Sequence, residues 1–148
     1  IGIYGVSHKV INMGFADLLL GAGAERPRWA ETGAAMIAID SLVHNFLRRS
    51  GILYWANSEH VFGATCYGRI GCERIVDQIS RAIDARPFGR GFPAYFPRFV
   101  QHTIWRFCAE QEAAICNGRA IDDNLRCAQN ECVVFERCGR IALNARAG

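Results

Sequence analysis

Two short stretches decide the fold that we expect: Gly5-Val6-Ser7-His8-Lys9-Val10 near the start, and Ile37-Ala38-Ile39-Asp40-Ser41-Leu42-Val43-His44 further along. In the first, a turn containing glycine feeds a helix that Ser7 can cap. In the second, an apolar run ends at Asp40, which stands directly before a helical pattern and can cap it. We therefore expect helices over residues 8–20 and 41–49, each with a chemically active side chain near its first turn.

The rest of the hydrophobic pattern is also helical. Apolar residues recur at helical spacing over residues 72–85, and again over residues 97–111, where Pro97 suits the first position of a helix. Gly51 ends the 41–49 helix, and residues 25–31 have the polar composition of a loop. No alternating strand pattern persists for more than a few residues, so we expect an all-α fold.

The composition favours a globular protein with a sizeable core. The chain has 148 residues, 51% of them hydrophobic, a net charge of +3 and no apolar run long enough to span a membrane. Lys9 is the only lysine, and every other basic residue is arginine. Arginine binds phosphate through two parallel hydrogen bonds, which suits a nucleic-acid partner, although a GC-rich genome would produce the same bias. No signal peptide is evident, so we expect a cytoplasmic protein.

The two opening stretches together resemble the helix-hairpin-helix DNA glycosylase superfamily, the group that includes endonuclease III and MutY. That family has a Gly-Val-Gly-x-Lys-type hairpin and then an apolar-Val-Asp-Thr-His-Val-type segment, and residues 45–53 look like its Arg-x-Gly-Leu ending. Here Ser7 replaces the second hairpin glycine, and the gap from Lys9 to Asp40 is longer than usual. The resemblance covers residues 3–53 best. It implies a first segment, 1–53, that holds the hairpin and the aspartate, and a helical C-terminal region, 54–148. We expect the two segments to form one compact unit.

The resemblance implies a base-excision enzyme acting on double-stranded DNA near the nucleoid, with Lys9 as the lyase lysine and Asp40 as the essential aspartate. An amine beside a phosphate-gripping turn can attack the sugar of a flipped nucleotide and form a Schiff base, and a carboxylate can stabilise the positive sugar. The family's DNA contacts fall on Gly5, Ser7, His8 and His44. The family's upstream helices would come from a missing N-terminal segment or a partner chain.

Other interpretations of the same residues stay open. Lys9 can be an ordinary solvated side chain, and Asp40 can be a helix cap alone. A relative with the same fold could act on hypermodified thymine by exchanging a group on the base. A non-catalytic DNA-binding module with a structural metal or cluster is the third function that we consider.

The chain has seven cysteines and no secretion signal, which favours a metal or cluster site over disulfides. Many members of the glycosylase family end in four cysteines that hold a [4Fe–4S] cluster, and the last of their spacings recurs here. The resemblance thus implies a cysteine-rich C-terminal lobe with a cluster on Cys116, Cys127, Cys132 and Cys138. Cys108 could replace Cys116 as a ligand, since both lie at or near the end of the helix expected over residues 97–111. Zinc and no metal are the alternatives. Four arginines would give this lobe a DNA-facing charge: Arg119, Arg126, Arg137 and Arg140.

Cys66 and Cys72 form a separate pair. With His44 and His60 they could make a Cys2His2 zinc site, although loop cysteines and half-buried histidines also arise without metal. The aromatic loop over residues 88–99 carries interleaved arginines. We expect its own aromatic rings to hold it in place, with stacking on nucleic-acid bases as the alternative.

Overall fold

Helix α1, His8–Leu20, begins and ends where the sequence predicts. In the computed structural model, which describes residues 4–144, Ser7 Oγ accepts a hydrogen bond from the Val10 amide at 3.4 Å. Gly5 has a φ of 78°, a left-handed conformation that glycine adopts without strain. A turn therefore leads into α1 as the hairpin pattern requires. Residues 1–3 of the first expected segment lie outside the described residues.

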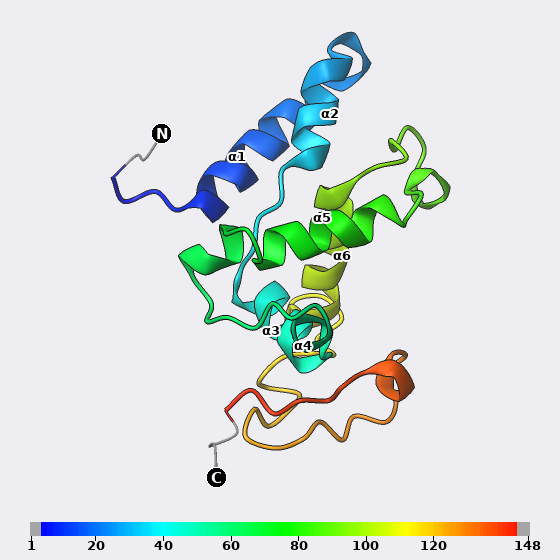
Figure 1. The fold of residues 1–148 in the computed structure, drawn as a ribbon. Coiled ribbons are helices and arrows are strands. Elements are labelled where there is room, and N and C mark those ends of the chain that lie inside the picture. Colours follow the sequence, from blue (N-terminus) through cyan, green and yellow to red (C-terminus); the bar gives the residue numbers. More distant parts are fainter. Residues whose placement is uncertain (1–3, 145–148) are drawn as a thin grey trace.

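Helix α2, Pro27–Ala35, lies where the sequence suggested a loop over residues 25–31, so that prediction was wrong. Pro27 occupies the first helical position, where its missing N–H removes no helical hydrogen bond. The Arg26 guanidinium also covers the Trp29 ring, 4.2 Å from its centroid. Figure 1 shows α2 folded back along α1 at one end of the molecule. The extra length between Lys9 and Asp40 is thus a helical hairpin.

Helix α3, Ser41–Arg49, confirms the predicted cap. Asp40 Oδ1 accepts a hydrogen bond from the Val43 amide at 2.9 Å. Gly51, with a φ of 87°, separates α3 from the short helix α4, Ile52–Trp55. Helix α5, Cys72–Arg81, and helix α6, Pro97–Cys108, end slightly earlier than the hydrophobic pattern predicts.

Helices from both expected segments share one core. Helix α6 packs against α2, α3 and α5. The core residues are Ile37, Ile39, Val43, Leu47, Leu53, Cys66, Cys72, Ile75, Val76 and Val100. Four 3-10 turns complete the helical elements: Gly23–Glu25, Ala64–Tyr67, Arg86–Phe88 and Phe135–Arg137. Residues 4–144 contain helices and no strand, which confirms the all-α class. In that same range, every helix is too short or too polar to cross a membrane.

The C-terminal part, residues 109–144, is mostly irregular and lies at the end of the molecule opposite the α1–α2 pair (Figure 1). It docks on the end of α3 through backbone hydrogen bonds. The Gly139 amide donates to the Ser50 carbonyl at 2.7 Å, and the Ile141 amide donates to the Arg49 carbonyl at 2.8 Å. The position of this lobe is therefore fixed by the residues at which α3 ends.

Gly33→Ala tests the close approach of α1 and α2. A Cβ at position 33 would lie 3.0 Å from both the Ala16 carbonyl oxygen and Leu19 Cβ. That contact is tighter than normal, so we expect the free energy of unfolding to fall by about 1–3 kcal/mol in urea titrations. Gly14→Ala is the matched control, because position 14 on α1 has no neighbouring atom within 4 Å. Gly14→Ala should raise the free energy of unfolding by about 1 kcal/mol, because alanine has a higher helix propensity than glycine. Unchanged stability of the first variant would contradict the packing.

Candidate active-site pocket and metal centre

Lys9 and Asp40 line the same pocket, which has a volume of about 500 Å³. Its walls come from α1, from the segment before α3, and from residues 92–105, which include most of α6. Lys9 shares its wall with Met13 and Asp17, which follow it at helical spacing on one face of α1. Both Lys9 and Asp40 are half-buried. The fold therefore brings together the two residues that the sequence singles out.

Much of the pocket wall is aromatic. The Phe92 ring packs against Phe96 and Phe99, with centroids 5.1 and 5.2 Å apart. The aromatic loop is thus held by its own rings, as predicted, and the same three rings face the pocket. The apolar lining consists of Met13, Leu20, Ala38, Phe92, Phe96, Phe99 and Trp105. A flat, apolar ligand would find contacts on several sides.

The polar part of the pocket comes mainly from α6. Arg98 donates to Gln101 Oε1 at 2.8 Å and lies 3.5 Å from an Asp17 carboxylate oxygen. Gln101 is only 4% exposed, and His102 stacks on Trp105 with ring centroids 5.5 Å apart. Burial, helped by the charge of Arg98, lowers the pKa of His102. The α6 residues of the pocket were missed in the sequence, where they look like one more amphipathic helix.

The hairpin residues and His44 have different surroundings. Gly5, Ser7 and His8 are exposed at the start of α1, where DNA could reach them. His44 is only 3% exposed and lies among Cys66, Cys72 and His60. A side chain buried in this way does not reach a phosphate, so His44 belongs with the metal-ligand group and not with the DNA contacts assigned from the resemblance.

His44, His60, Cys66 and Cys72 each offer a ligand atom, and these atoms lie within 4.8 Å of one another, so the four could hold a metal ion such as zinc. His44 Nδ1 lies 3.3 Å from Cys72 Sγ and 3.6 Å from Cys66 Sγ. His60 Nε2 lies 3.3 Å from Cys72 Sγ. Tetrahedral zinc bonds of roughly 2.0–2.3 Å place nitrogen and sulfur ligands about 3.6 Å apart. The observed separations are close to that value.

The surroundings of the two histidines suit metal ligation. Burial lowers the pKa of His44 to about 4, so its imidazole is neutral at physiological pH. His60 Nδ1 lies 2.6 Å from the Ser58 carbonyl oxygen, to which it donates, so Nε2 is the ring nitrogen that faces the sulfur of Cys72. Burial raises the pKa of the Cys72 thiol and so disfavours the thiolate. A bound cation would stabilise the thiolate and reverse this effect.

The four C-terminal cysteines predicted as cluster ligands, Cys116, Cys127, Cys132 and Cys138, line one small cavity at the end of α3. Cys108 does not line it, but lies buried at the end of α6. Within residues 4–144, these four thiols do not gather as closely as the ligand atoms of the His44 group. Their spacing is therefore looser than that of a single-ion site.

Arg49 is a buried cation beside these cysteines. It is 2% exposed and lines the same cavity, and its Nη2 forms an ion pair with Asp123. Nε and Nη1 of Arg49 are buried without a hydrogen-bond partner in the described structure. The neighbouring Cys108 thiol, and then the charge of Arg49, lower the pKa of the Cys116 thiol to about 7. Negative charge is thus favoured on Cys116, whereas burial raises the pKa of Cys138 in the same cavity.

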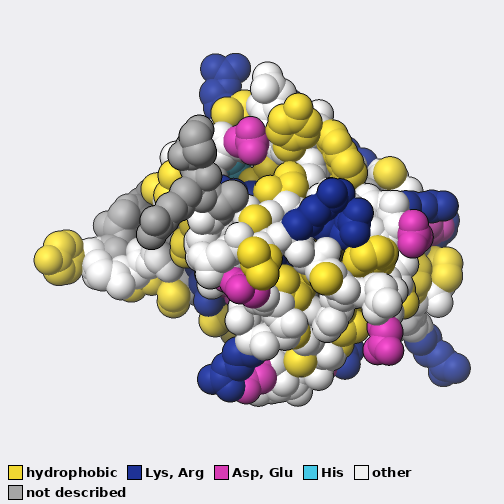
Figure 2. Space-filling view, turned by 90° about the horizontal axis from the view of Figure 1, so that it is seen from below, with side chains coloured by type: hydrophobic (Ala, Val, Ile, Leu, Met, Phe, Trp, Pro, Cys, Tyr) yellow, Lys and Arg dark blue, Asp and Glu magenta, His cyan; other side chains and the backbone are white. Residues whose placement is uncertain are grey.

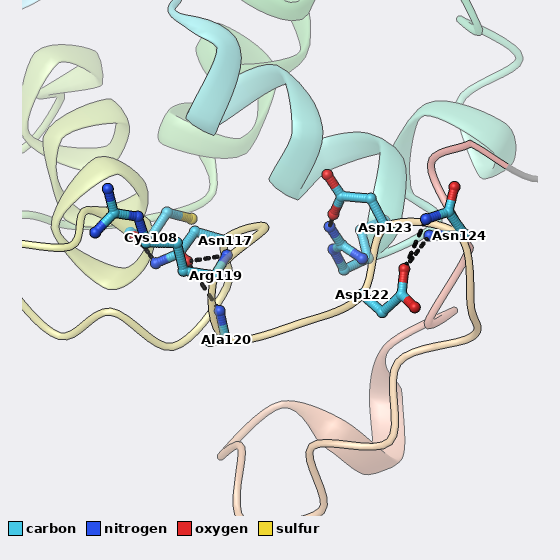
Figure 3. Close-up of polar contacts among 8 residues, drawn as sticks. Cys108, Asn117, Arg119, Ala120, Asp122, Asp123 and Asn124 are labelled. Atoms are coloured by element: carbon cyan, nitrogen blue, oxygen red, sulfur yellow. Dashed lines mark hydrogen bonds and ion pairs between the residues drawn. The ribbon is translucent and has the colours of Figure 1, made fainter.

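Figure 3 shows how the loop that carries Asp123 is held. The Asn117 amide donates to the Cys108 carbonyl at 2.7 Å, and Asn117 Oδ1 accepts from the Arg119 and Ala120 amides at 2.9 and 3.1 Å. These bonds anchor the loop to the end of α6 and keep its acidic side chain near α3.

Two of the four arginines predicted to face DNA from the C-terminal lobe make contacts within the lobe. Arg119 forms an ion pair with Glu110, and the Arg140 guanidinium lies 4.5 Å from the centroid of the Phe135 ring. Figure 2 views the molecule from the end at which this lobe lies, and basic side chains there are spread among acidic and apolar ones. This face presents no continuous basic patch.

The chain was compared with protein-family models, with curated proteins and with solved structures, and none of the three comparisons gave a match. The likeness of the stretches around Lys9 and Asp40 to the DNA glycosylases therefore stays a prediction.

Proposed function

We propose that this chain is a DNA base-excision glycosylase-like enzyme with an associated lyase activity, in which Lys9 and Asp40 act on a nucleotide flipped out of double-stranded DNA. One observation carries the proposal: Lys9 and Asp40, far apart in the sequence, line one aromatic pocket of about 500 Å³. A pocket of that size accommodates a nucleobase and part of its sugar.

The walls of the pocket suit a flipped base. Enzymes that act on a base in DNA take it out of the stack, hold its faces between aromatic or apolar side chains and read its edge with hydrogen bonds. Phe92, Phe99 and Trp105 supply aromatic surface, and the buried Gln101 amide supplies a donor and an acceptor. The exposed turn at Gly5 would meet the phosphate backbone through its N–H groups.

The proposed reaction uses both residues. The neutral amine of Lys9 adds to C1′ of the flipped nucleotide, and the base leaves with the electron pair of the glycosidic bond and takes up a proton. Opening of the sugar ring gives an imine between Nζ and C1′, and loss of a C2′ proton then expels the 3′ phosphate. Asp40 stabilises the positive charge on the sugar and moves protons.

Asp40 can cap α3 and act on the substrate at the same time. One carboxylate oxygen, Oδ1, accepts the hydrogen bond from Val43 that starts α3. The second oxygen is left for the substrate, and the cap fixes the side-chain rotamer before substrate binds.

We further propose that Cys116, Cys127, Cys132 and Cys138 hold a [4Fe–4S] cluster. Two features support the proposal: the four thiols line one cavity, of about 20 Å³ before any cluster binds, and buried Arg49 has unpaired donors beside it. A cluster bound by four thiolates is anionic, so it would supply the acceptors that Arg49 lacks. The Arg140 amide already donates to Cys138 Sγ at 3.4 Å, a contact typical of cluster ligands.

Borohydride trapping tests the role of Lys9. The wild-type protein should become covalently linked to a duplex containing an abasic site, because hydride reduces the imine between Nζ and C1′. Lys9→Gln should reduce the yield by about 100-fold or more. Since the chain has no other lysine, mass analysis of the linked peptide separates Lys9 from the amino terminus. A wild-type protein that binds the duplex without forming the adduct would favour the non-catalytic module.

Asp40→Asn separates the cap from the chemistry. Asparagine caps helices as well as aspartate does, so the free energy of unfolding should change by less than about 0.5 kcal/mol. Base excision in single-turnover assays, on duplexes that each carry one modified base, should slow by about 100-fold or more, because the carboxylate charge is lost. Asp40→Ala is the comparison variant and should also lose about 1 kcal/mol of stability. Excision by Asp40→Asn at the wild-type rate would make the residue a cap only.

Metal analysis of protein purified without oxygen tests the cluster. We expect a brown protein with about four irons per chain. Cys132→Ser should lose the iron and the colour, whereas Cys66→Ser should keep both, because Cys66 lies in the separate His44 group and does not line the cavity. Iron-free wild-type protein would exclude the cluster.

A further inference from the structure

The group formed by His44, His60, Cys66 and Cys72 is separate from the two sites above. None of the four lines the Lys9–Asp40 pocket or the C-terminal cysteine cavity. We propose that these four residues bind one Zn²⁺ ion, and that the ion fixes the loop of residues 57–71 so that Tyr67 holds the backbone beside Asp40 and Lys9. The second half of this inference rests on the proposed function.

The donor set suits a structural zinc site. Two thiolates and two neutral imidazoles fill the four positions of a tetrahedral ion and leave none open for water or substrate. Cys66 and Cys72 are fully buried, and His44 nearly so. Mixed nitrogen and sulfur ligands favour zinc over the oxygen-seeking ions magnesium and calcium.

The loop lacks a core of its own. Of residues 57–71, only Ser58, Cys66 and Gly71 are buried, while Val61 is 82% exposed and Ile70 is 59% exposed. Apolar packing therefore gives this segment little to hold it in one conformation. An ion bound by His60 and Cys66 would tie the loop to α3 and α5, through His44 and Cys72.

The backbone of the loop closes tightly at its end. A Cβ on Gly71 would lie 2.3 Å from the Cys66 carbonyl oxygen and 2.4 Å from that of Thr65. Only glycine fits at this point, directly before Cys72. The chain therefore turns back on itself, which brings the Cys66 and Cys72 thiols into the same group of ligand atoms.

Tyr67, next to Cys66, connects the loop to the proposed catalytic residues. Its hydroxyl accepts a hydrogen bond from the Ile39 amide at 2.9 Å and lies 3.3 Å from the Ile39 carbonyl oxygen, to which it donates. Its ring stacks on His8 with centroids 5.2 Å apart. Ile39 directly precedes Asp40, and His8 directly precedes Lys9. Tyr67 does not line the pocket, so it is a positioning residue.

Zinc analysis and cobalt substitution test the metal site directly. The full chain should contain about one zinc. Replacement by Co²⁺ should give the intense visible absorption of a tetrahedral thiolate site. Cys66→Ser and Cys72→Ser should each lose the ion and the cobalt spectrum, while Cys108→Ser keeps both. Wild-type protein with neither zinc nor a tetrahedral cobalt spectrum would overturn the metal site.

Hydrogen exchange at the Ile39 amide tests the coupling without any need for activity. This amide donates to the Tyr67 hydroxyl. Removing zinc with a chelator should therefore speed its exchange by at least about tenfold, and Tyr67→Phe should do the same with zinc still bound. Unchanged exchange after zinc removal would overturn the coupling. Because this readout and the zinc content are independent of catalysis, they can succeed even if borohydride trapping fails.

Kinetics of Tyr67→Phe test whether the coupling serves the reaction. The phenyl ring keeps the stack on His8 and loses the hydrogen bonds to Ile39. We expect kcat for base excision to fall by about tenfold with KM nearly unchanged, because the variant alters the placement of catalytic groups more than binding. A kcat equal to that of the wild type would remove the positioning role.

Discussion

Helix α3 is the element on which the three sites depend. It has nine residues, and Asp40 caps its start, His44 joins the metal-ligand group from its middle, and Arg49 reaches the cysteine cavity from its end. Val43 and Leu47 are completely buried, so the rotation of the helix about its axis is set by the core. A change in that rotation would displace the pocket, the metal ligands and the cavity at once, which couples the stability of the core to the geometry of all three.

Two irregular segments are held against this helix by polar and sulfur contacts more than by apolar packing. The loop of residues 57–71 reaches α3 where His60 and Cys66 lie beside His44, and the lobe of residues 109–144 reaches it through Arg49 and through backbone bonds to the residues at its end. Segments that bury little apolar surface gain too little to offset their conformational entropy. Metal ligation is a common solution, and all seven cysteines lie in these two segments or directly at their borders.

Local signals made part of this structure predictable. Ser7 and Asp40 are caps whose side chains bond within three residues, so the starts of α1 and α3 follow from the sequence. Helix α2 was missed because residues 25–31 look polar, whereas the packing of Gly33 against α1 is a tertiary contact that no local pattern reveals. The place of Gln101 in the pocket and the burial of His44 were missed for the same reason. The placement of Lys9 and Asp40 on one pocket was anticipated only through the family resemblance, since nothing in their sequence spacing predicts it.

Several arginines have structural roles. Neither of the two explanations of the arginine bias, a nucleic-acid partner or a GC-rich genome, includes these roles. Arg49 is buried against Asp123, Arg98 is held between Asp17 and Gln101, and Arg140 covers Phe135. The planar guanidinium suits these roles, because it can pair, donate and stack at the same time. Fewer arginines are then left to form a basic patch, in keeping with the mild net charge of +3. The proposed DNA contact does not need such a patch. A glycine turn binds phosphate through its backbone N–H groups. A few such contacts are enough to set the position and register of a protein on DNA.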